Sequence, residues 1–473
     1  HYDPDISRYF LAVLTIDQDS VTGAFTGKNR IDFAVSATSD PTGSWFRYKL
    51  AVQNDGTEGT PNHRCDGDPS LPPEVTNKSA CIGDYPHIGV DKYGFFLTTN
   101  EYSFFSDGSN GGAGYTGAQI YAMSKRSLAA GSTGSLVLFA NPALGQFRSF
   151  TVWPAIAPAG QDSLANGGTE YLMSSTLGDG SETGNTAASE DRLGVWAITN
   201  TSSLDSATPR LQLASTLVHA STYALPPQAT QKDGPAPLRD CLNDREDTFG
   251  PGLGCWALFF DSPPDLQVLG KLDAGDTRMQ QVAYSKGMLW GALSTAVSVR
   301  GDRGATEIRA GVLWVGVKVK AESDGRTSKV QGATTRTGYL ALAGNDVSYP
   351  ALGLSTSGKL VVGVTVSGAD HYPSAGYALL DARNQRGNAV LHVASEGVGP
   401  QDGFTEYPPI GGDRPRWGDY GALAMDGDTV WVANESIEQS CTLDEWLTGA
   451  LGSCGGTRTA LANWGTRITA LRP

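Results

Sequence analysis

The sequence lacks several patterns that would place it in a well-marked class. No apolar run approaches the roughly 18 residues that a membrane-spanning helix needs, so no transmembrane segment is expected. Nucleic acids and anionic membranes call for clustered Lys and Arg, whereas 35 basic residues here face 49 acidic ones and the net charge is −14. No P-loop, dinucleotide-binding fingerprint, nucleophile elbow or EF-hand loop is present. The sequence therefore requires no cofactor, although carboxylates and loop carbonyls leave Ca²⁺ as an option.

Cysteine is also scarce, and none of it has the CxxC spacing of a zinc site. The six cysteines fall in three local pairs: Cys65/Cys81, Cys241/Cys255 and Cys441/Cys454. We expect three disulfides that staple loops, and hence a secreted protein from an oxidising compartment. Three glycosylation sequons fit this setting: Asn77, Asn200 and Asn434.

A short motif recurs along the chain. Residues 85–89 (YPHIG) return as 153–157 (WPAIA) and 349–353 (YPALG), and more loosely at Asp419-Tyr420. Each copy precedes a turn and an apolar run, and the copies suggest units of roughly 70 residues. Strands such as 360–366 (LVVGVTV) are apolar without alternation, so both of their faces must be covered. Radially stacked blades cover their sheets in this way.

We therefore predict an all-β fold, a six-bladed β-propeller, with seven blades as the alternative. Residues 1–473 would form one domain of four-stranded antiparallel blades, its ring closed by the terminal segments. The approximate blades are 1–83, 84–149, 150–225, 272–345, 346–410 and 411–473, and a disulfide-stapled insertion occupies 226–271. In the last blade, Thr442 and Glu445 form a capping-box pattern that predicts a short helix.

Four segments together resemble a known group of proteins. They are 84–102 (DYPHIGVDKYGFFLTTNEY), 36–45 (SATSDPTGSW), 273–292 (DAGDTRMQQVAYSKGMLWGA) and 416–435 (RWGDYGALAMDGDTVWVANE). The chain resembles secreted sialidase-like or BNR-like β-propellers over nearly its whole length. The resemblance implies a propeller fold and an extracellular setting, and most such proteins have no assigned reaction. A sialidase proper is not expected, because the Asp-box spacing at 38–45 departs from that motif and a third substrate-binding arginine is missing.

Candidate functional residues follow from the propeller prediction, since propellers bind ligands at one mouth of the channel that their innermost strands line. The candidates for catalysis are His87, Arg278, Arg416, Asp84, Tyr85, Glu101 and Asp419. The candidates for stacking on sugar rings are Trp153, Tyr349 and Trp417. The repeated Tyr-Pro and Asp-Tyr copies also have a structural reading, as turn caps and spacers between blades. A functional residue is normally unique to one blade, which favours His87, Arg278, Arg416 and Trp417.

These candidates support two enzyme functions, a glycoside hydrolase and a uronate lyase. Both would act on an extracellular glycan. Glycoside hydrolysis needs two carboxylates, for which Glu101, Asp84, Asp419 and Glu435 are available. A uronate lyase would instead use His87 or Tyr85 as base and an arginine to neutralise the substrate carboxylate. The alternative is a non-catalytic propeller that binds a glycan or a protein, or that serves a structural role.

Overall fold

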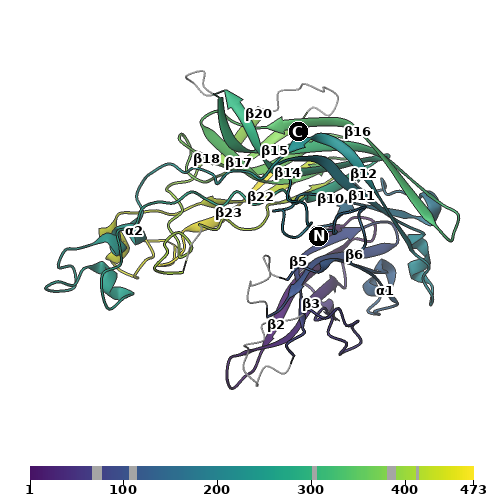
Figure 1. Ribbon diagram of the computed structural model, residues 1–473, viewed down its shortest axis with the longest axis horizontal. Helices are drawn as coiled ribbons and strands as arrows, with labels where there is room; N and C mark the ends of the chain where they lie inside the picture. Colours follow the sequence, from purple (N-terminus) through teal and green to yellow (C-terminus); the bar gives the residue numbers. More distant parts are fainter. Residues whose placement is uncertain (66–76, 106–113, 301–305, 381–389, 412–414, 457) are drawn as a thin grey trace. The chain divides into compact units, whose positions relative to one another are not determined.

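The computed structural model describes the whole chain except residues 66–76, 106–113, 301–305, 381–389, 412–414 and 457. Strands far outnumber helices in the described chain, and its helices are short (Figure 1), as predicted. The chain divides into two compact units. Unit 1 comprises His1–Ala224, Thr277–Gly291 and Val315–Thr337, and unit 2 comprises Leu225–Asp276, Ala292–Trp314 and Gly338–Pro473.

The strands form six successive meanders of hydrogen-bonded neighbours. Unit 1 carries β1 (Tyr2–Asp3), β2 (Arg8–Gln18), β3 (Phe25–Ser36), β4 (Trp45–Ala51), β5 (Cys81–Val90), β6 (Gly94–Ser103), β7 (Gly117–Ser124), β8 (Leu136–Ala140), β9 (Trp153–Ile156), β10 (Thr169–Ser175), β11 (Glu190–Thr199) and β12 (Gln212–Tyr223). The fourth meander contributes residues to both units: β13 (Gln280–Ser285), β14 (Met288–Arg300), β15 (Thr306–Ser323) and β16 (Ser328–Leu340). Unit 2 carries β17 (Asn345–Leu354), β18 (Leu360–Gly368), β19 (Ser374–Leu380), β20 (Val390–Ser395), β21 (Ala422–Asp426), β22 (Thr429–Ile437) and β23 (Trp464–Leu471).

Four-stranded antiparallel sheets, as predicted, are formed by β1–β4 and β17–β20. The meanders β5–β8 and β9–β12 are also four-stranded and antiparallel, but they belong to one 12-stranded sheet with β13–β16. The last meander, β21–β23, has three strands within the described residues. In unit 1 the first strands of neighbouring meanders also pair with each other, in parallel: β5 with β9 and β9 with β13. This pairing joins successive sheets along their first strands.

The helices are single turns or little more. They are α1 (Lys125–Ala129), η1 (Ala165–Gly167), η2 (Thr201–Asp205), α2 (Pro237–Asn243), η3 (Cys255–Leu258) and α3 (Leu443–Leu447). The capping box at α3 is confirmed, since Thr442 accepts from the Glu445 backbone N–H and the Glu445 side chain accepts from the Thr442 backbone N–H. No helix in the described ranges is both long and apolar enough to span a bilayer.

The Tyr-Pro motif marks a β-bulge. The registers of β5 and β17 shift between Asp84 and His87 and between Ser348 and Ala351. Within each bulge the tyrosine has a left-handed backbone, with φ 56° at Tyr85 and 50° at Tyr349. A non-glycine residue holds this conformation only where its surroundings enforce it, so the motif is a structural feature of these first strands.

The copy of the motif at residues 153–157 is offset from the position that the sequence alignment gave it. His87 and Ala351 are the first residues paired after their bulges, each two positions beyond the left-handed tyrosine. Just before β9 the left-handed residue is Thr151 (φ 45°), and Trp153, two positions later, pairs with Met173. Trp153 is therefore equivalent to His87, and the predicted equivalence with Tyr85 is wrong by two residues.

The cores lie between successive sheets within each unit. In unit 1, side chains of β2, β3 and β4 pack against those of β5, β6 and β7 around Phe33 and Phe95, whose rings stack 5.6 Å apart. In unit 2, β18 is buried along its whole length, and one of its faces packs against β21 and β22. This burial on both faces is what the unbroken apolar run of β18 predicted.

The three predicted disulfides are confirmed: Cys65–Cys81, Cys241–Cys255 and Cys441–Cys454. The second and third belong to the same small core of unit 2. There α2 and η3, from the predicted insertion, pack with α3 around the buried Tyr407 and Trp446. Two stapled loops that are distant in sequence thus share one hydrophobic cluster.

Candidate functional site

The strongest candidate site in unit 2 centres on Glu435. Burial alternates along β22, so Asn434 and Ser436 point into the sheet packing while Glu435 lies half-buried on the other face. The Asn434 amide donates to the Val364 carbonyl at 2.7 Å, which fixes the strand against β18. The backbone therefore holds Glu435 in a defined position, although its own side chain faces outward.

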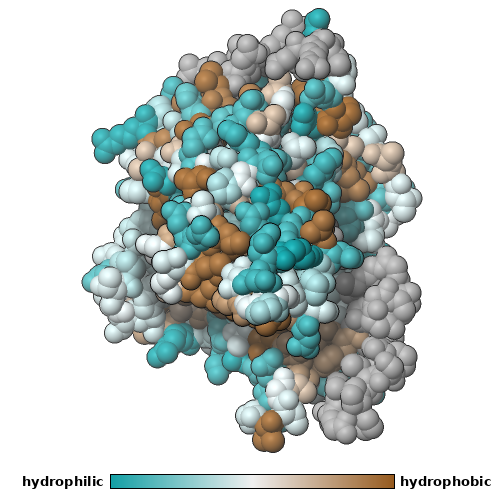
Figure 2. Space-filling view, turned by 90° about the vertical axis from the view of Figure 1, so that its left-hand side faces the viewer, coloured by the Kyte–Doolittle hydropathy of each residue, from teal (hydrophilic) through white to brown (hydrophobic). Residues whose placement is uncertain are grey.

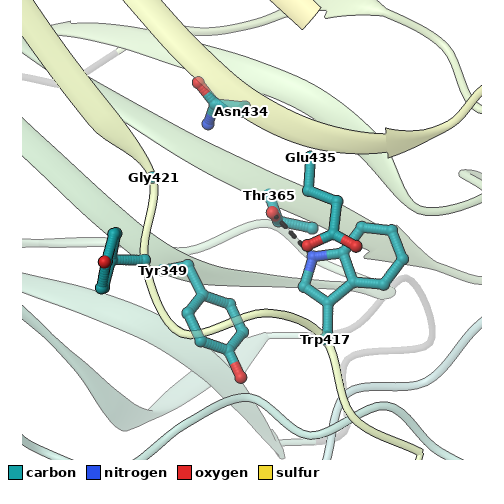
Figure 3. Close-up of a pocket in the computed structure, with 7 residues that line it drawn as sticks. Tyr349, Thr365, Trp417, Gly421, Asn434 and Glu435 are labelled. Atoms are coloured by element: carbon teal, nitrogen blue, oxygen red, sulfur yellow. Dashed lines mark hydrogen bonds between the residues drawn. The ribbon is translucent and has the colours of Figure 1, made fainter. Parts of the chain in front are cut away.

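The segment before β21 builds one wall of the site. Trp417 is buried and its Nε1–H donates to Thr365 Oγ1 at 3.0 Å (Figure 3). A small pocket is lined by Tyr349, Thr365, Trp417, Tyr420, Gly421, Asn434 and Glu435. Gly418 has φ 57°, and a Cβ there would lie 2.7 Å from Glu435 Oε2. Glycine thus lets the chain turn directly beside the carboxyl group.

A second pocket of about 320 Å³ opens on the other side of Glu435. Its lining comprises Gln401, Gly403, Phe404, Thr405, Arg416, Gly418, Glu435, Leu461, Ala462 and Trp464. Phe404 and Trp464 are 52% and 57% exposed, unusually high values for side chains of this size. The pocket therefore combines exposed aromatic surface with one carboxyl and one guanidinium group.

The carboxyl groups of Glu435 and Asp419 lie in different electrostatic environments. Burial, with a further contribution from the charge of Asp419, raises the pKa of Glu435 to about 7. Asp419 forms an ion pair with Arg416, whose Nη2 lies 3.1 Å from Asp419 Oδ1, and both side chains are exposed. The Glu435 carboxyl group therefore keeps its proton to a higher pH than an ordinary glutamate does, whereas Asp419 is ion-paired. Asp419 and Tyr420, the loose copy of the motif, precede β21, which begins at Ala422.

A buried ion pair supports the far wall of the larger pocket. Asp402 and Arg458 are both 0% exposed, and Arg458 Nη2 lies 2.7 Å from Asp402 Oδ2. Asp402 also accepts from the Tyr407 hydroxyl at 2.6 Å and from the backbone N–H groups at the start of α2. The Asp402 backbone N–H donates to Asn463. This network ties residues 401–407 and 458–463 to α2, so the wall is rigid.

The unit 1 candidates form a separate aromatic cluster. The ring of His87 lies 3.9 Å from that of Trp153 and 4.5 Å from that of Tyr85, measured between centroids. The Arg278 guanidinium stacks on Tyr85 at 4.8 Å and on Phe150 at 5.2 Å. The structure thus brings together Tyr85, His87, Trp153 and Arg278, and their place in a ligand-binding lining stays a prediction.

The environment of His87 favours a packing role over proton transfer. His87 is 3% exposed, and burial together with the nearby charge of Arg278 holds its pKa well below 6.5. It is therefore a neutral, enclosed imidazole. Asp84, three residues earlier in β5, is exposed.

Glu101 is buried and enclosed by hydrogen-bond donors. Asn54 Nδ2 donates to its Oε2, and Thr116 Oγ1 and Gln119 Nε2 donate to its Oε1 at 2.6 and 3.2 Å. His63 Nδ1 lies 2.8 Å from Oε1, and this hydrogen bond raises the pKa of His63. Sequence reasoning selected Glu101 and missed His63, because only the fold of the 53–65 loop brings the two together.

Metal binding finds little support among the described residues. One group of three metal-ligand side chains converges there, namely Cys65, Cys81 and Glu101. Both sulfur atoms belong to a disulfide, which leaves Glu101 as the one available ligand. Calcium stays a prediction.

The three sequons differ in their surroundings. Asn77 and Asn200 are partly exposed, and their amide groups donate to Asp55 and to the Arg210 carbonyl. Asn434 is buried and its amide nitrogen is engaged by Val364. A glycan on that nitrogen would have no room in this conformation, so the folded chain leaves Asn77 and Asn200 as candidates.

Comparison with known proteins gives weak likenesses. No protein-family model and no curated sequence matches the chain. Among solved structures, the phage phi92 endosialidase is 8% identical with a TM-score of 0.32, over 98% of this chain and 65% of that one. A mutant α-L-arabinanase from Cellvibrio cellulosa is 10% identical with a TM-score of 0.26, over 82% of this chain and 91% of that one. A glycoside hydrolase is 10% identical with a TM-score of 0.23, over 83% and 88%. TM-scores this low carry no argument about the fold or function of this chain.

Proposed function

We propose that this protein is a secreted, carbohydrate-active β-propeller that hydrolyses a glycan at the Glu435 pocket. One observation carries the proposal. A pocket of about 320 Å³ joins a carboxyl group whose pKa is about 7 to two exposed aromatic rings. Aromatic faces suit sugar rings, and a carboxyl group that is protonated near neutral pH suits a glycosidic oxygen.

The proposed chemistry assigns a role to each group. Glycoside hydrolysis needs one carboxylic acid and one carboxylate on opposite sides of the bond. Glu435 would donate its proton to the leaving oxygen, because it keeps that proton up to about pH 7. Asp419, held by Arg416, would act as base or nucleophile. Phe404 and Trp464 would stack on neighbouring sugar rings.

The finer fold prediction belongs to the same proposal. Six blades in one domain, residues 1–473, would use the six successive meanders, and the terminal segments would close the ring. The parallel pairing of β5, β9 and β13 supports this arrangement, because the innermost strands of neighbouring blades run in the same direction. The three disulfides support an extracellular setting, where glycans are available. Bound Ca²⁺ remains an open part of the proposal.

The test is the release of product from a panel of neutral, sialylated and uronic polysaccharides. Reducing ends would report hydrolysis, and an unsaturated product would report a lyase. Glu435→Gln and Asp419→Asn should each lower hydrolysis by roughly a hundredfold or more. Glu438→Gln is the matched control, because Glu438 is an exposed carboxylate just beyond β22. Arg278→Ala asks whether the unit 1 cluster serves the same reaction.

Three outcomes would change the proposal. Hydrolysis that survives both carboxyl variants would keep the enzyme and reject the Glu435 site. An unsaturated product would favour a uronate lyase. Glycan binding without cleavage, weakened by Trp464→Ala, would favour the non-catalytic alternative, because the aromatic rings would then serve recognition alone.

A further inference from the structure

The disulfide lobe, which we define as residues 237–268, presents an unusual amount of apolar surface. Leu266 and Val268 are 71% and 79% exposed. Three more large apolar side chains of the lobe are exposed as well: Phe249, Leu253 and Leu258. Such a concentration in one short stretch marks an interaction surface, because a soluble face rarely gathers large apolar groups.

The lobe holds these side chains in a fixed arrangement. The Phe249 N–H donates to the Leu253 carbonyl at 2.8 Å, which sets these two residues side by side at the tip of the Cys241–Cys255 loop. Asn243 exchanges two hydrogen bonds with the backbone of Gln267, at 2.8 and 2.6 Å, and so joins the stretch that carries Leu266 and Val268 to the end of α2.

The base of the lobe is anchored as firmly as its tip. The Asp244 carboxylate accepts from the Cys255 N–H at 2.6 Å and from Thr248 Oγ1 at 2.5 Å. Phe259 packs against the core around Trp446. The exposed groups are therefore preorganised, so a partner that binds them loses little conformational entropy in the lobe.

The exposed charge of the lobe is mainly negative. Its exposed charged residues are Arg245 and four acids, namely Glu246, Asp247, Asp261 and Asp265. Figure 2, in which the side that carries α2 faces the viewer, shows apolar patches set among hydrophilic side chains. Apolar anchors with an acidic rim complement a surface that is apolar at its centre and basic at its edge.

We propose that the disulfide lobe is a docking surface for a basic protein partner with exposed apolar anchors. The acidic rim opposes an anionic membrane and a second copy of this acidic lobe, since both would bring like charges together. The inference is independent of the reaction at Glu435.

The test measures binding of two labelled synthetic peptides of equal length, one of Leu and Lys and one of Leu and Glu, by fluorescence anisotropy. We expect the Leu/Lys peptide to bind the whole protein, more weakly at raised salt, and the Leu/Glu peptide to bind far less. The triple variant Phe249→Ser, Leu266→Ser, Val268→Ser should lose about tenfold in affinity. Leu164→Ser and Val390→Ser are matched controls, because both side chains are exposed and lie outside the lobe.

Several results would overturn the proposal. They are no binding of the Leu/Lys peptide, equal binding of both peptides, and equal binding by the triple variant when its melting temperature is unchanged. Binding to zwitterionic lipid vesicles that the triple variant loses would assign the surface to a membrane. A concentration-dependent dimer that the triple variant abolishes would assign it to a second copy of the chain.

Discussion

Glu406 should make the stability of unit 2 depend on pH, and Glu406→Gln should remove that dependence. Glu406 is 4% exposed, its Oε2 has no hydrogen-bond partner within the described chain, and its Oε1 accepts from the Gly270 N–H. Burial, with a further contribution from the charge of Asp402, raises the pKa of Glu406 from 4.5 to about 8. The folded protein therefore binds this proton more tightly than the unfolded chain does.

The sign and size of the effect follow from linkage. A raised folded pKa gives stability that is complete below pH 4.5 and is lost progressively as the pH rises to about 8. At 1.36 kcal/mol per pH unit, this group would account for a loss of at most roughly 5 kcal/mol over that range. Glutamine carries no titrating proton, so the variant should gain on the wild type by up to this amount between the two ends of the range.

The assay is urea unfolding at a series of pH values. Glu246→Gln is the control, because Glu246 is an exposed glutamate of the same unit. The difference between wild type and Glu406→Gln isolates Glu406 from other titrating groups, such as Glu435. Parallel stability curves for the two proteins would refute the reasoning. So would a control variant that changes slope as much as Glu406→Gln does.

Two further predictions concern buried pairs. Asp402→Ala leaves Arg458 charged and unpaired, so it should lower the free energy of unfolding in urea by roughly 3–5 kcal/mol. The double variant Asp402→Leu, Arg458→Met should lower it by less, because no buried charge is left unpaired. Equal losses in the two variants would contradict this. The Glu101 hydrogen bond raises the pKa of His63, so the stability from this pair is complete below pH 6.5 and is lost as the pH rises through the folded pKa. The melting temperature of His63→Gln should therefore fall furthest below that of the wild type at low pH, and a gap that is constant with pH would count against the pairing.

Features set by near neighbours in the chain were predictable. Each disulfide joins cysteines within one short stretch, and the Thr442–Glu445 capping box spans one helical turn. The unbroken apolar run of β18 predicted that both faces of this strand are buried. The strand β16 has no comparable mark in the sequence, since Ser328–Leu340 mixes Thr, Gly and charged residues and contains no apolar run.

The two-residue error at Trp153 shows where sequence similarity misleads. The alignment matched aromatic-proline pairs, whereas the backbone matches the residue of positive φ, which is Thr151 in that copy. Residue type and backbone conformation are separate properties of a repeat. The feature that all three copies share is the left-handed residue two positions before the first paired residue, and the proline has no fixed position relative to it.

The pocket at Glu435 could not be predicted from the sequence, because it is assembled from segments that are distant along the chain. Its lining comes from four segments, 401–405, 416–418, 435 and 461–464, and none of them carries a motif for acid–base chemistry. The outer two segments are joined by hydrogen bonds from Phe404 to Leu461 and from Asp402 to Asn463. The buried Asp402–Arg458 pair, whose partners lie 56 residues apart, supports them. The raised pKa of Glu435 likewise comes from burial in the folded chain, with a further contribution from the charge of Asp419. The sequence of each repeat predicts its own strands. A site built from the loops between strands cannot be predicted in this way, because only the fold brings those loops together.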